Sequence, residues 1–129
     1  MENRRVLVDT SVIIDYLRKT NKEKTLFWEL VNKYNCYVSA VTVYEIYTGA
    51  KDEAKRVEAD TVISFLNVIP FDTPQAKNAS IIFQKLKKKN KLIEFRDIFI
   101  ASCAIVQNIQ LATFNTNHFE RIKELKILK

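Results

Sequence analysis

The feature that most constrains the fold is the alternation of short apolar segments with longer segments of helical periodicity. The apolar segments predict β-strands at Arg5–Asp9, Cys36–Ser39, Asn67–Phe71 and Gln110–Phe114, with a further candidate at Leu125–Leu128. Between them, apolar side chains recur at positions i, i+3, i+4 and i+7, as in Phe27, Leu30, Val31 and Tyr34. Strands that alternate with helices predict a mostly parallel sheet with helices on both faces. The single glycine and two prolines argue against a hairpin-rich β architecture.

Two of the predicted helices carry local signals of their own. Thr73 followed by Pro74 predicts the start of a helix, with Thr73 as N-cap and the proline at the first helical position. Asn90, which follows three lysines, predicts a left-handed residue that ends this helix. The segment Ile98–Val106 is apolar on every side, which predicts a helix buried in the core.

Length and charge limit the protein class. The 129 residues fit one domain, 1–129, with a substantial core. The formal net charge of +6 makes polyanions plausible partners. Much of the excess lies at Lys85–Lys91, a cluster that is typical either of a solvated helix end or of a weak track for RNA phosphates through Lys87, Lys88 and Lys89.

The cysteines and the apolar runs indicate a compartment. Cys36 and Cys103 lie in apolar segments without metal-ligand spacing, so we expect two buried thiols in a reducing environment. The first residues lack the apolar core of a signal peptide, and no apolar run approaches the length of a membrane span. We therefore expect a cytoplasmic protein with no membrane partner.

Three of the fifteen acidic residues stand out because apolar sequence surrounds them. Asp9 closes the first predicted strand and is followed by two hydroxyl residues; it could instead be a helix N-cap. Glu45 follows the second strand, where Thr42 and Glu45 also fit a capping box. Asp97 opens the buried helix, where it could cap that helix or pair with Arg96. Each has an ordinary structural interpretation when taken alone.

Taken together, the three acids favour a metal site. In a parallel sheet, ligands bind beyond the carboxyl ends of the strands, which is where Asp9 falls. If the three helix starts converge at that edge, three carboxylates meet, and they cannot all stay ionised without a cation. Hard oxygen ligands suit Mg²⁺ or Mn²⁺, and such sites hydrolyse phosphate esters.

The sequence resembles a PIN domain, and more narrowly the VapC-type toxins of toxin–antitoxin pairs. Four stretches carry the resemblance over nearly the whole chain: "VLVDTSVIIDYL" at 6–17, "SAVTVYEIYTGA" at 39–50, "LIEFRDIFIASCAI" at 92–105 and "LATFNTNHFERI" at 111–122. The resemblance implies a three-layer α/β/α fold around a central, mostly parallel sheet of four or five strands. It also implies a Mg²⁺- or Mn²⁺-dependent endoribonuclease.

The resemblance also assigns roles to individual residues. Asp9, Glu45 and Asp97 become metal ligands and catalytic acids, with Glu45 sharing the ion directly or through water. Thr10 and Ser11 would support Asp9. In the fourth stretch, Thr113 and Asn115 would hydrogen-bond a metal-bound water, with Asn115 among the catalytic residues.

The chain departs from the family pattern at two places. Many relatives carry an acid where this chain has Asn115 or His118, so a second metal ion would be held more weakly. His118 could donate a proton, but a lone histidine before Phe119 is more often structural. Asn90 stands where relatives often have glycine, and asparagine tolerates the same left-handed conformation.

The resemblance further implies an RNA substrate, a cognate antitoxin whose C-terminal segment lies in a groove near the acids, and a homodimer. Two alternatives stay open: a PIN domain that serves in RNA processing, and a catalytically silent module that binds RNA or protein. A phosphatase of the haloacid dehalogenase type would need a second acid where Ser11 stands. A receiver domain would need paired acids where Arg4 and Arg5 precede the first strand.

Overall fold

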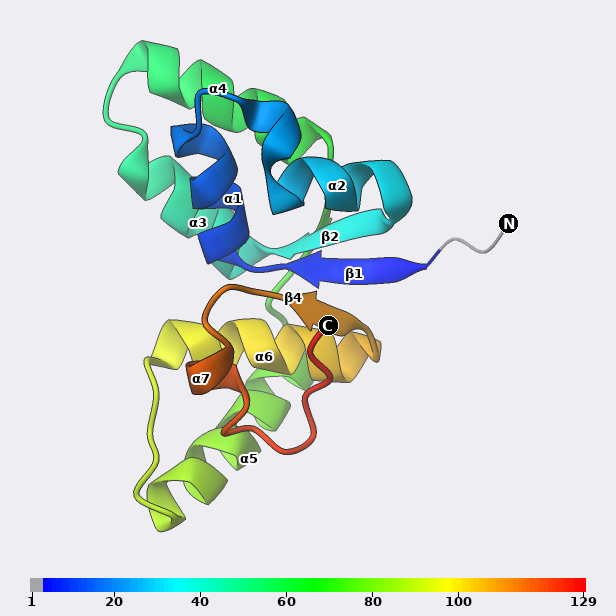
Figure 1. Ribbon diagram of the computed structural model, residues 1–129. Coiled ribbons are helices and arrows are strands. Elements are labelled where there is room, and N and C mark those ends of the chain that lie inside the picture. Colours follow the sequence, from blue (N-terminus) through cyan, green and yellow to red (C-terminus); the bar gives the residue numbers. More distant parts are fainter. Residues whose placement is uncertain (1–3) are drawn as a thin grey trace.

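The computed structural model describes residues 4–129, and its centre is a four-stranded sheet (Figure 1). The strands are β1 (Arg5–Val8), β2 (Asn35–Ser39), β3 (Asn67–Ile69) and β4 (Gln110–Ala112), in the order β3-β2-β1-β4. All three pairings are parallel. The predicted parallel sheet is therefore confirmed. The candidate strand at 125–128 contributes only an isolated parallel bridge between Leu111 and Ile127.

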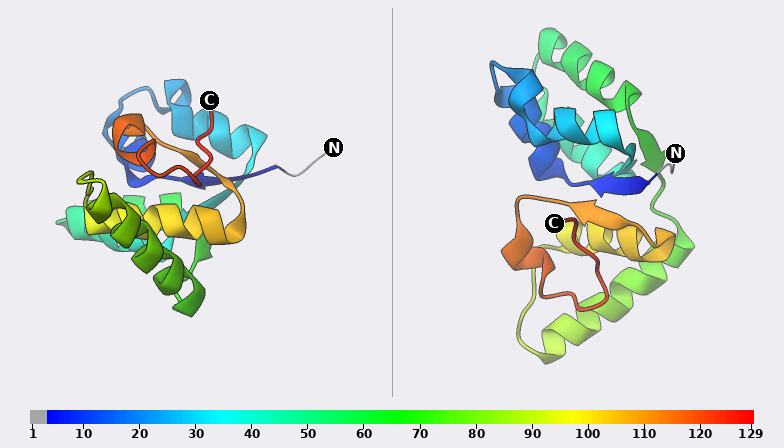
Figure 2. Two further views of the ribbon diagram at one scale, coloured as in Figure 1. Left: turned by 90° about the horizontal axis from the view of Figure 1, so that it is seen from below. Right: turned by 45° about the vertical axis from the view of Figure 1, so that its right-hand side comes forward.

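Helices cover both faces of this sheet, as expected for a three-layer α/β/α fold (Figures 1 and 2). On one face lie α1 (Thr10–Arg18), the short 3-10 helix η1 (Lys22–Lys24), α2 (Leu26–Lys33), α3 (Ala40–Gly49) and α4 (Glu53–Ser64). On the other face lie α5 (Thr73–Lys88), α6 (Phe95–Gln107), α7 (Thr116–Phe119) and the C-terminal segment. The chain thus builds one helical layer before the other.

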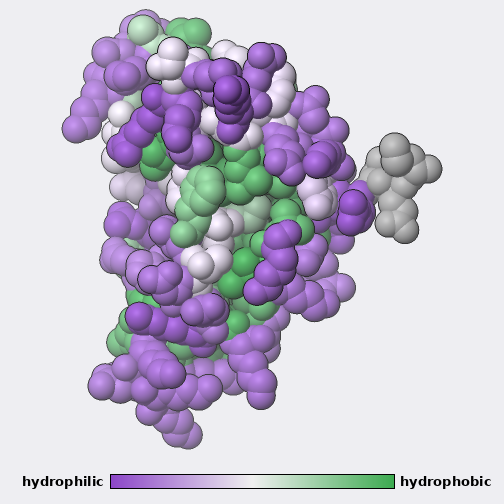
Figure 3. Space-filling model, in the orientation of Figure 1, coloured by the Kyte–Doolittle hydropathy of each residue, from purple (hydrophilic) through white to green (hydrophobic). Residues whose placement is uncertain are grey.

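The hydrophobic core is divided by the sheet into two clusters. Val6 and Val8 of β1 pack with α1 to α4, whereas Leu7 packs with α5 and α6. All three side chains are fully buried because neighbouring side chains of a strand point to opposite faces and both faces are covered. On the surface seen in Figure 3, hydrophobic side chains gather in a band at the middle of the molecule, between hydrophilic zones.

The helix ends confirm one local prediction and correct another. Asn90 has φ 57°, the expected left-handed conformation after α5. The N-cap of α5, however, is Asp72 and not Thr73: the Asp72 carboxylate accepts a hydrogen bond from the Thr73 N–H at 2.8 Å and forms a capping box with Gln75. Pro74 therefore occupies the second helical position, where its missing N–H is equally harmless.

The remaining structural expectations concern the buried helix, the thiols and membrane spans. Helix α6 contains the apolar segment 98–106 and buries six of its side chains. Cys36 and Cys103 are buried free thiols, and burial raises the pKa of Cys36 to about 11, which keeps it protonated and unreactive. Within residues 4–129, no helix has both the length and the apolar character that a membrane span requires.

Candidate active site

The site lies at the edge of the sheet where the parallel strands end and helices begin. Helix α1 starts directly after β1, and α3 starts directly after β2, with Ser39 as its N-cap. The loop after β4 and the first turn of α6 reach the same side of the molecule (Figure 1). Segments that are far apart in the sequence thereby bring their polar side chains together at one edge.

Asp9 is buried, with 2% of its surface exposed, and hydroxyl groups hold its carboxylate. Its Oδ2 accepts hydrogen bonds from Ser11 Oγ and Thr113 Oγ1, both at 2.7 Å. These hydroxyls in turn accept the backbone N–H groups of Phe114, at 3.1 Å, and Asn115, at 2.9 Å. Because each hydroxyl already accepts an N–H, its own proton is directed at the carboxylate. Asp9 sits at the N-cap position of α1 but makes no capping hydrogen bond, so the capping interpretation is wrong.

Glu45 is the sixth residue of α3, so it lies too far along the helix to form a capping box. The α3 N-cap is Ser39, which accepts the Val41 N–H at 2.9 Å. Thr10 donates to Glu45 Oε1 at 2.6 Å, and Thr10 Oγ1 also lies 2.9 Å from Thr42 Oγ1. The other carboxylate oxygen, Oε2, lies 3.4 Å from Arg96 Nε.

Asp97 is the third residue of α6, after the N-cap residue Glu94. Burial raises the pKa of its carboxyl group, and the nearby negative charge of Asp9 raises that pKa further, with a smaller contribution from Glu45. His118 opposes these effects, since its Nδ1 lies 3.5 Å from Asp97 Oδ2. Arg96 does not pair with Asp97 but with Glu45 and Glu94. Asp9 and Glu45 therefore both lie close enough to Asp97 to repel its charge.

Two residues of the fourth sequence stretch differ in their relation to the acids. Asn115 is exposed at the N-cap position of α7, where its side chain makes no capping bond and its backbone N–H contacts Thr113. His118, although 48% exposed, contacts Asp97 directly. Sequence reasoning gave this histidine a structural role, because only the fold places α7 beside the start of α6.

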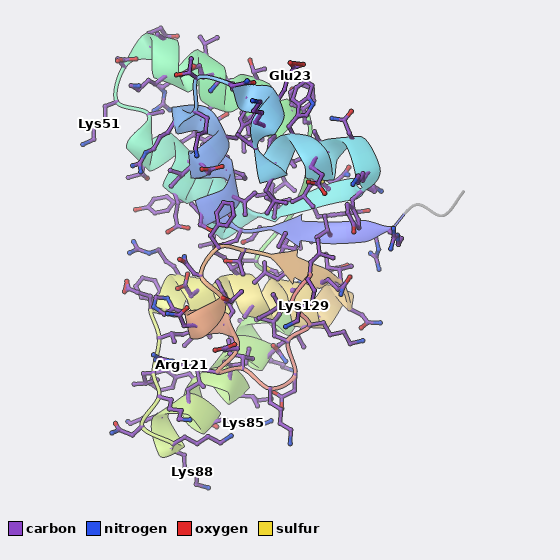
Figure 4. All side chains as sticks on the ribbon, viewed as in Figure 1. Glu23, Lys51, Lys85, Lys88, Arg121 and Lys129 are labelled. Carbon is purple, nitrogen blue, oxygen red and sulfur yellow. The ribbon has the colours of Figure 1, made fainter. Side chains whose placement is uncertain are left out.

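The lysines expected to attract RNA lie apart from the acids. Lys87 and Lys88 form the last turn of α5, and Lys89 follows it. Figure 4 shows Lys88 at the end of α5 that points away from the sheet. Lys85, one turn earlier, pairs with Glu124 of the C-terminal segment at 3.2 Å.

Of the three carboxylates at this edge, Asp9 and Asp97 suit a hard cation better than Glu45 does. Among residues 4–129, no group of three or more His, Cys, Asp or Glu side chains is arranged to hold a metal ion. The two carboxylate oxygens of Glu45 already face Thr10 and Arg96. Asp9 and Asp97, in contrast, repel each other without an intervening cation. Mg²⁺ typically takes one or two carboxylates plus water and substrate phosphate, so this pair alone suffices for a site.

A cavity of about 280 Å³ adjoins Glu45 between α1, α3 and α4. Apolar side chains such as Ile14, Leu17 and Ile46 line it, together with the charged Arg18 and Lys55. The cavity is thus an amphipathic recess that includes Glu45 in its wall.

Comparisons with known proteins agree with this geometry. The PIN domain family matches residues 6–125. The chain is 33% identical over 123 residues to Ribonuclease VapC1 of Methanocaldococcus jannaschii, which covers 95% of this chain and 85% of that protein. Solved structures also share the fold. VapBC-1 from nontypeable Haemophilus influenzae has a TM-score of 0.84 and 23% identity, with 97% of each chain covered. A toxin–antitoxin complex from Klebsiella pneumoniae has a TM-score of 0.75 and 23% identity, with 93% of this chain and 94% of that chain covered.

Proposed function

The chain belongs to the PIN domain family, and from this premise we propose that it is an endoribonuclease, the toxin of a toxin–antitoxin pair, that hydrolyses RNA with the help of a divalent metal ion. The observation that carries the proposal is the meeting of Asp9, Glu45 and Asp97 at one sheet edge, where burial and the charges of Asp9 and Glu45 raise the pKa of Asp97. The likeness to Ribonuclease VapC1 supports the ribonuclease assignment.

Asp9 and Asp97 would hold Mg²⁺ or Mn²⁺. The raised pKa of Asp97 supports this assignment, because burial and the nearby charge of Asp9 both disfavour its ionised form, and a bound cation would offset that cost. When bound, the ion would activate a water molecule and offset the charge that builds up on the scissile phosphate. Asp9 is rigid because Ser11 and Thr113 fix its carboxylate, so the geometry exists before the substrate arrives.

Glu45 would orient the attacking water and accept its proton. Thr10 holds one oxygen of Glu45, which aims the carboxylate toward the other acids. Water attack in line with the leaving oxygen breaks the bond from phosphorus to the 3′ oxygen and leaves 5′-phosphate and 3′-hydroxyl ends. Asn115 has an exposed side chain near this edge and would contact the RNA or a bound water.

RNA is the best-supported substrate class. The net charge of +6 favours a polyanion. Phe114, whose backbone N–H contacts Ser11 Oγ beside Asp9, has a side chain that is 52% exposed, and an exposed aromatic ring suits the stacking of an unpaired base. Lys87, Lys88 and Lys89 would add attraction to phosphates that is independent of base sequence.

Two protein partners complete the proposal. The recess beside Glu45 would receive the C-terminal segment of a cognate antitoxin, because it is apolar in part and opens next to the acids. A homodimer is supported by a second, almost wholly apolar cavity of about 320 Å³ between α5 and α6, where Phe83 and Phe95 are exposed. Light scattering of the purified chain would measure its oligomeric state.

A cleavage assay tests the proposed activity. The purified chain, incubated with folded RNAs and Mg²⁺ or Mn²⁺, should produce fragments with 5′-phosphate ends. EDTA and the Asp97→Asn substitution should each abolish cleavage. Products with 2′,3′-cyclic phosphate ends would contradict the mechanism, and RNA binding that needs no metal and leads to no cleavage would favour the silent module.

A further inference from the structure

Arg96 lies at the acidic edge, and the proposed chemistry leaves it without a role. Its Nε lies 3.4 Å from Glu45 Oε2, and its Nη2 lies 3.2 Å from Glu94 Oε1. The guanidinium also lies over the ring of Phe95, with 5.5 Å between Cζ and the ring centroid. Three neighbours therefore hold this cation at the rim of the site.

The contact with Glu45 changes what that carboxylate can do. Glu45 Oε1 accepts the hydroxyl of Thr10, while Oε2 faces Arg96. Neither Asp9 nor Asp97 is paired with a lysine or arginine among residues 4–129. His118 contacts Asp97 at 3.5 Å. An added divalent ion thus finds Asp9 and Asp97 free of lysine and arginine, whereas Glu45 is already paired with a cation.

This ion pair is easily broken. The Arg96 and Glu45 side chains are 41% and 24% exposed, so solvent screens their attraction, and such pairs contribute little to stability. A phosphodiester can offer the guanidinium two oxygens in a bidentate arrangement, which it binds more strongly than a single exposed carboxylate oxygen. The chemistry that draws Arg96 away is therefore that of the RNA backbone.

We propose that Arg96 is an internal counter-ion that competes with the divalent metal for Glu45 and is released when a phosphodiester binds its guanidinium. The inference rests on the metal site of the proposed function. Because releasing Arg96 frees Glu45, binding of the metal and binding of the nucleic acid should strengthen each other. Without nucleic acid, the protein keeps its own metal affinity low.

The test is a double-mutant cycle on Mn²⁺ binding, measured by electron paramagnetic resonance of free Mn²⁺ on the full-length, metal-free protein. Arg96→Gln should tighten Mn²⁺ binding roughly tenfold, because it frees Glu45 and removes a nearby positive charge. As a single substitution, Glu45→Gln should change the Mn²⁺ affinity little, because Arg96 already occupies this carboxylate in the wild type. In the Glu45→Gln background, most of the gain from Arg96→Gln should vanish.

Two controls separate this effect from a general change in charge. Arg56→Gln removes an exposed arginine that lies over Tyr47 and forms no ion pair with Asp9, Glu45 or Asp97, and it should leave Mn²⁺ affinity unchanged. Arg96→Lys keeps the charge and should stay close to the wild type. A mixed-sequence single-stranded DNA, used as a phosphodiester that lacks the 2′-hydroxyl, should tighten Mn²⁺ binding by the wild type but not by Arg96→Gln.

The inference is overturned if Arg96→Gln gains nothing, if it gains equally with and without Glu45, or if no variant binds Mn²⁺. An unchanged affinity of the wild type in the presence of DNA would overturn the release by phosphodiester. These outcomes are independent of cleavage. If the cycle holds but the wild type cleaves no RNA, the proposed function fails while the competition at Glu45 stands.

Discussion

Two hydroxyl groups fix the most buried charge of the site. Asp9 Oδ2 accepts hydrogen bonds from two hydroxyls. One belongs to Ser11 at the same helix start, and the other to Thr113 in the loop after β4, 104 residues away in the sequence. Each hydroxyl is itself oriented by a backbone N–H. A carboxylate buried to this extent is costly unless such bonds satisfy it, so these donors serve both stability and catalysis.

Thr113→Val should therefore impair the protein in two ways. It keeps the shape of the side chain but removes one hydrogen bond to a charged group, which should lower the free energy of unfolding by about 1.5–3 kcal/mol. Cleavage should fall as well, because Asp9 loses its orientation. Urea unfolding and the cleavage rate measure the two effects, and Thr113→Ser should restore both. Thr61→Val, at an exposed threonine of α4, is the matched control.

The carboxyl group of Asp97 should make the stability of the folded protein depend on pH. Its pKa in the folded protein lies above the ordinary value of 3.8, so the native state binds this proton more tightly than the unfolded chain does. The charge therefore costs stability at neutral pH, and the cost disappears as the pH falls through the raised pKa to below 3.8.

Asp97→Asn should accordingly raise the melting temperature of the metal-free protein by a few degrees at pH 7 while it abolishes cleavage. The difference from the wild type should shrink as the pH is lowered toward 4. Added Mg²⁺ should stabilise the wild type but not the variant. Thermal melts at several pH values, with and without Mg²⁺, measure all three effects. A variant less stable than the wild type at pH 7 would contradict the cost of holding this charge buried and next to Asp9.

Among the secondary-structure elements, helix α5 begins one residue earlier than its sequence predicts: the N-cap is Asp72 and not Thr73. Asp72 caps the helix through a capping box with Gln75, although Thr73 followed by Pro74 is equally typical of a helix start. The choice depends on backbone angles at the turn after β3. Asp72 has the extended conformation of an N-cap, whereas Thr73 is already helical.

Asp72→Ala should lower the free energy of unfolding by about 1 kcal/mol, since a helix loses its N-cap. Thr73→Ala, one residue later, should have a much smaller effect. Denaturant titration compares the two variants. Cleavage by both should match the wild type, because neither residue contacts the acids. A larger loss at Thr73 would show that the cap lies there in solution.

At the scale of the whole molecule, the sheet separates two layers of different charge. Residues 1–66, which include β1, β2 and the layer of α1 to α4, contain ten basic and ten acidic side chains. Residues 67–129, which form β3, β4 and the layer of α5 to α7, contain eleven basic and five acidic side chains. The entire net charge of +6 thus belongs to the second half of the chain. Figure 4 places Lys85, Lys88, Arg121 and Lys129 in that half of the molecule.

Replacing Lys87, Lys88 and Lys89 together with alanine should weaken RNA binding several-fold at low salt and much less at high salt. The maximal cleavage rate and Mn²⁺ affinity should stay unchanged, because these lysines lie away from the acids. Fluorescence anisotropy over a salt series measures the affinity. The same triple change at Lys24, Lys33 and Lys51 of the neutral layer is the control. Equal losses from both triples would mean that only total charge matters.

The parallel sheet, the left-handed Asn90 and the buried α6 helix follow from the sequence alone, which also singles out Asp9, Glu45 and Asp97 among fifteen acids as candidate ligands. These depend on hydrophobic periodicity and on the polarity of near neighbours, which are local properties. The tertiary structure decided which side chains meet. It paired Arg96 with Glu45 instead of its neighbour Asp97, placed His118 beside Asp97 and brought Thr113 to Asp9. Hydrogen bonds and ion pairs act over a few ångströms, so they depend on how the packed helices and strands place groups that are distant in sequence.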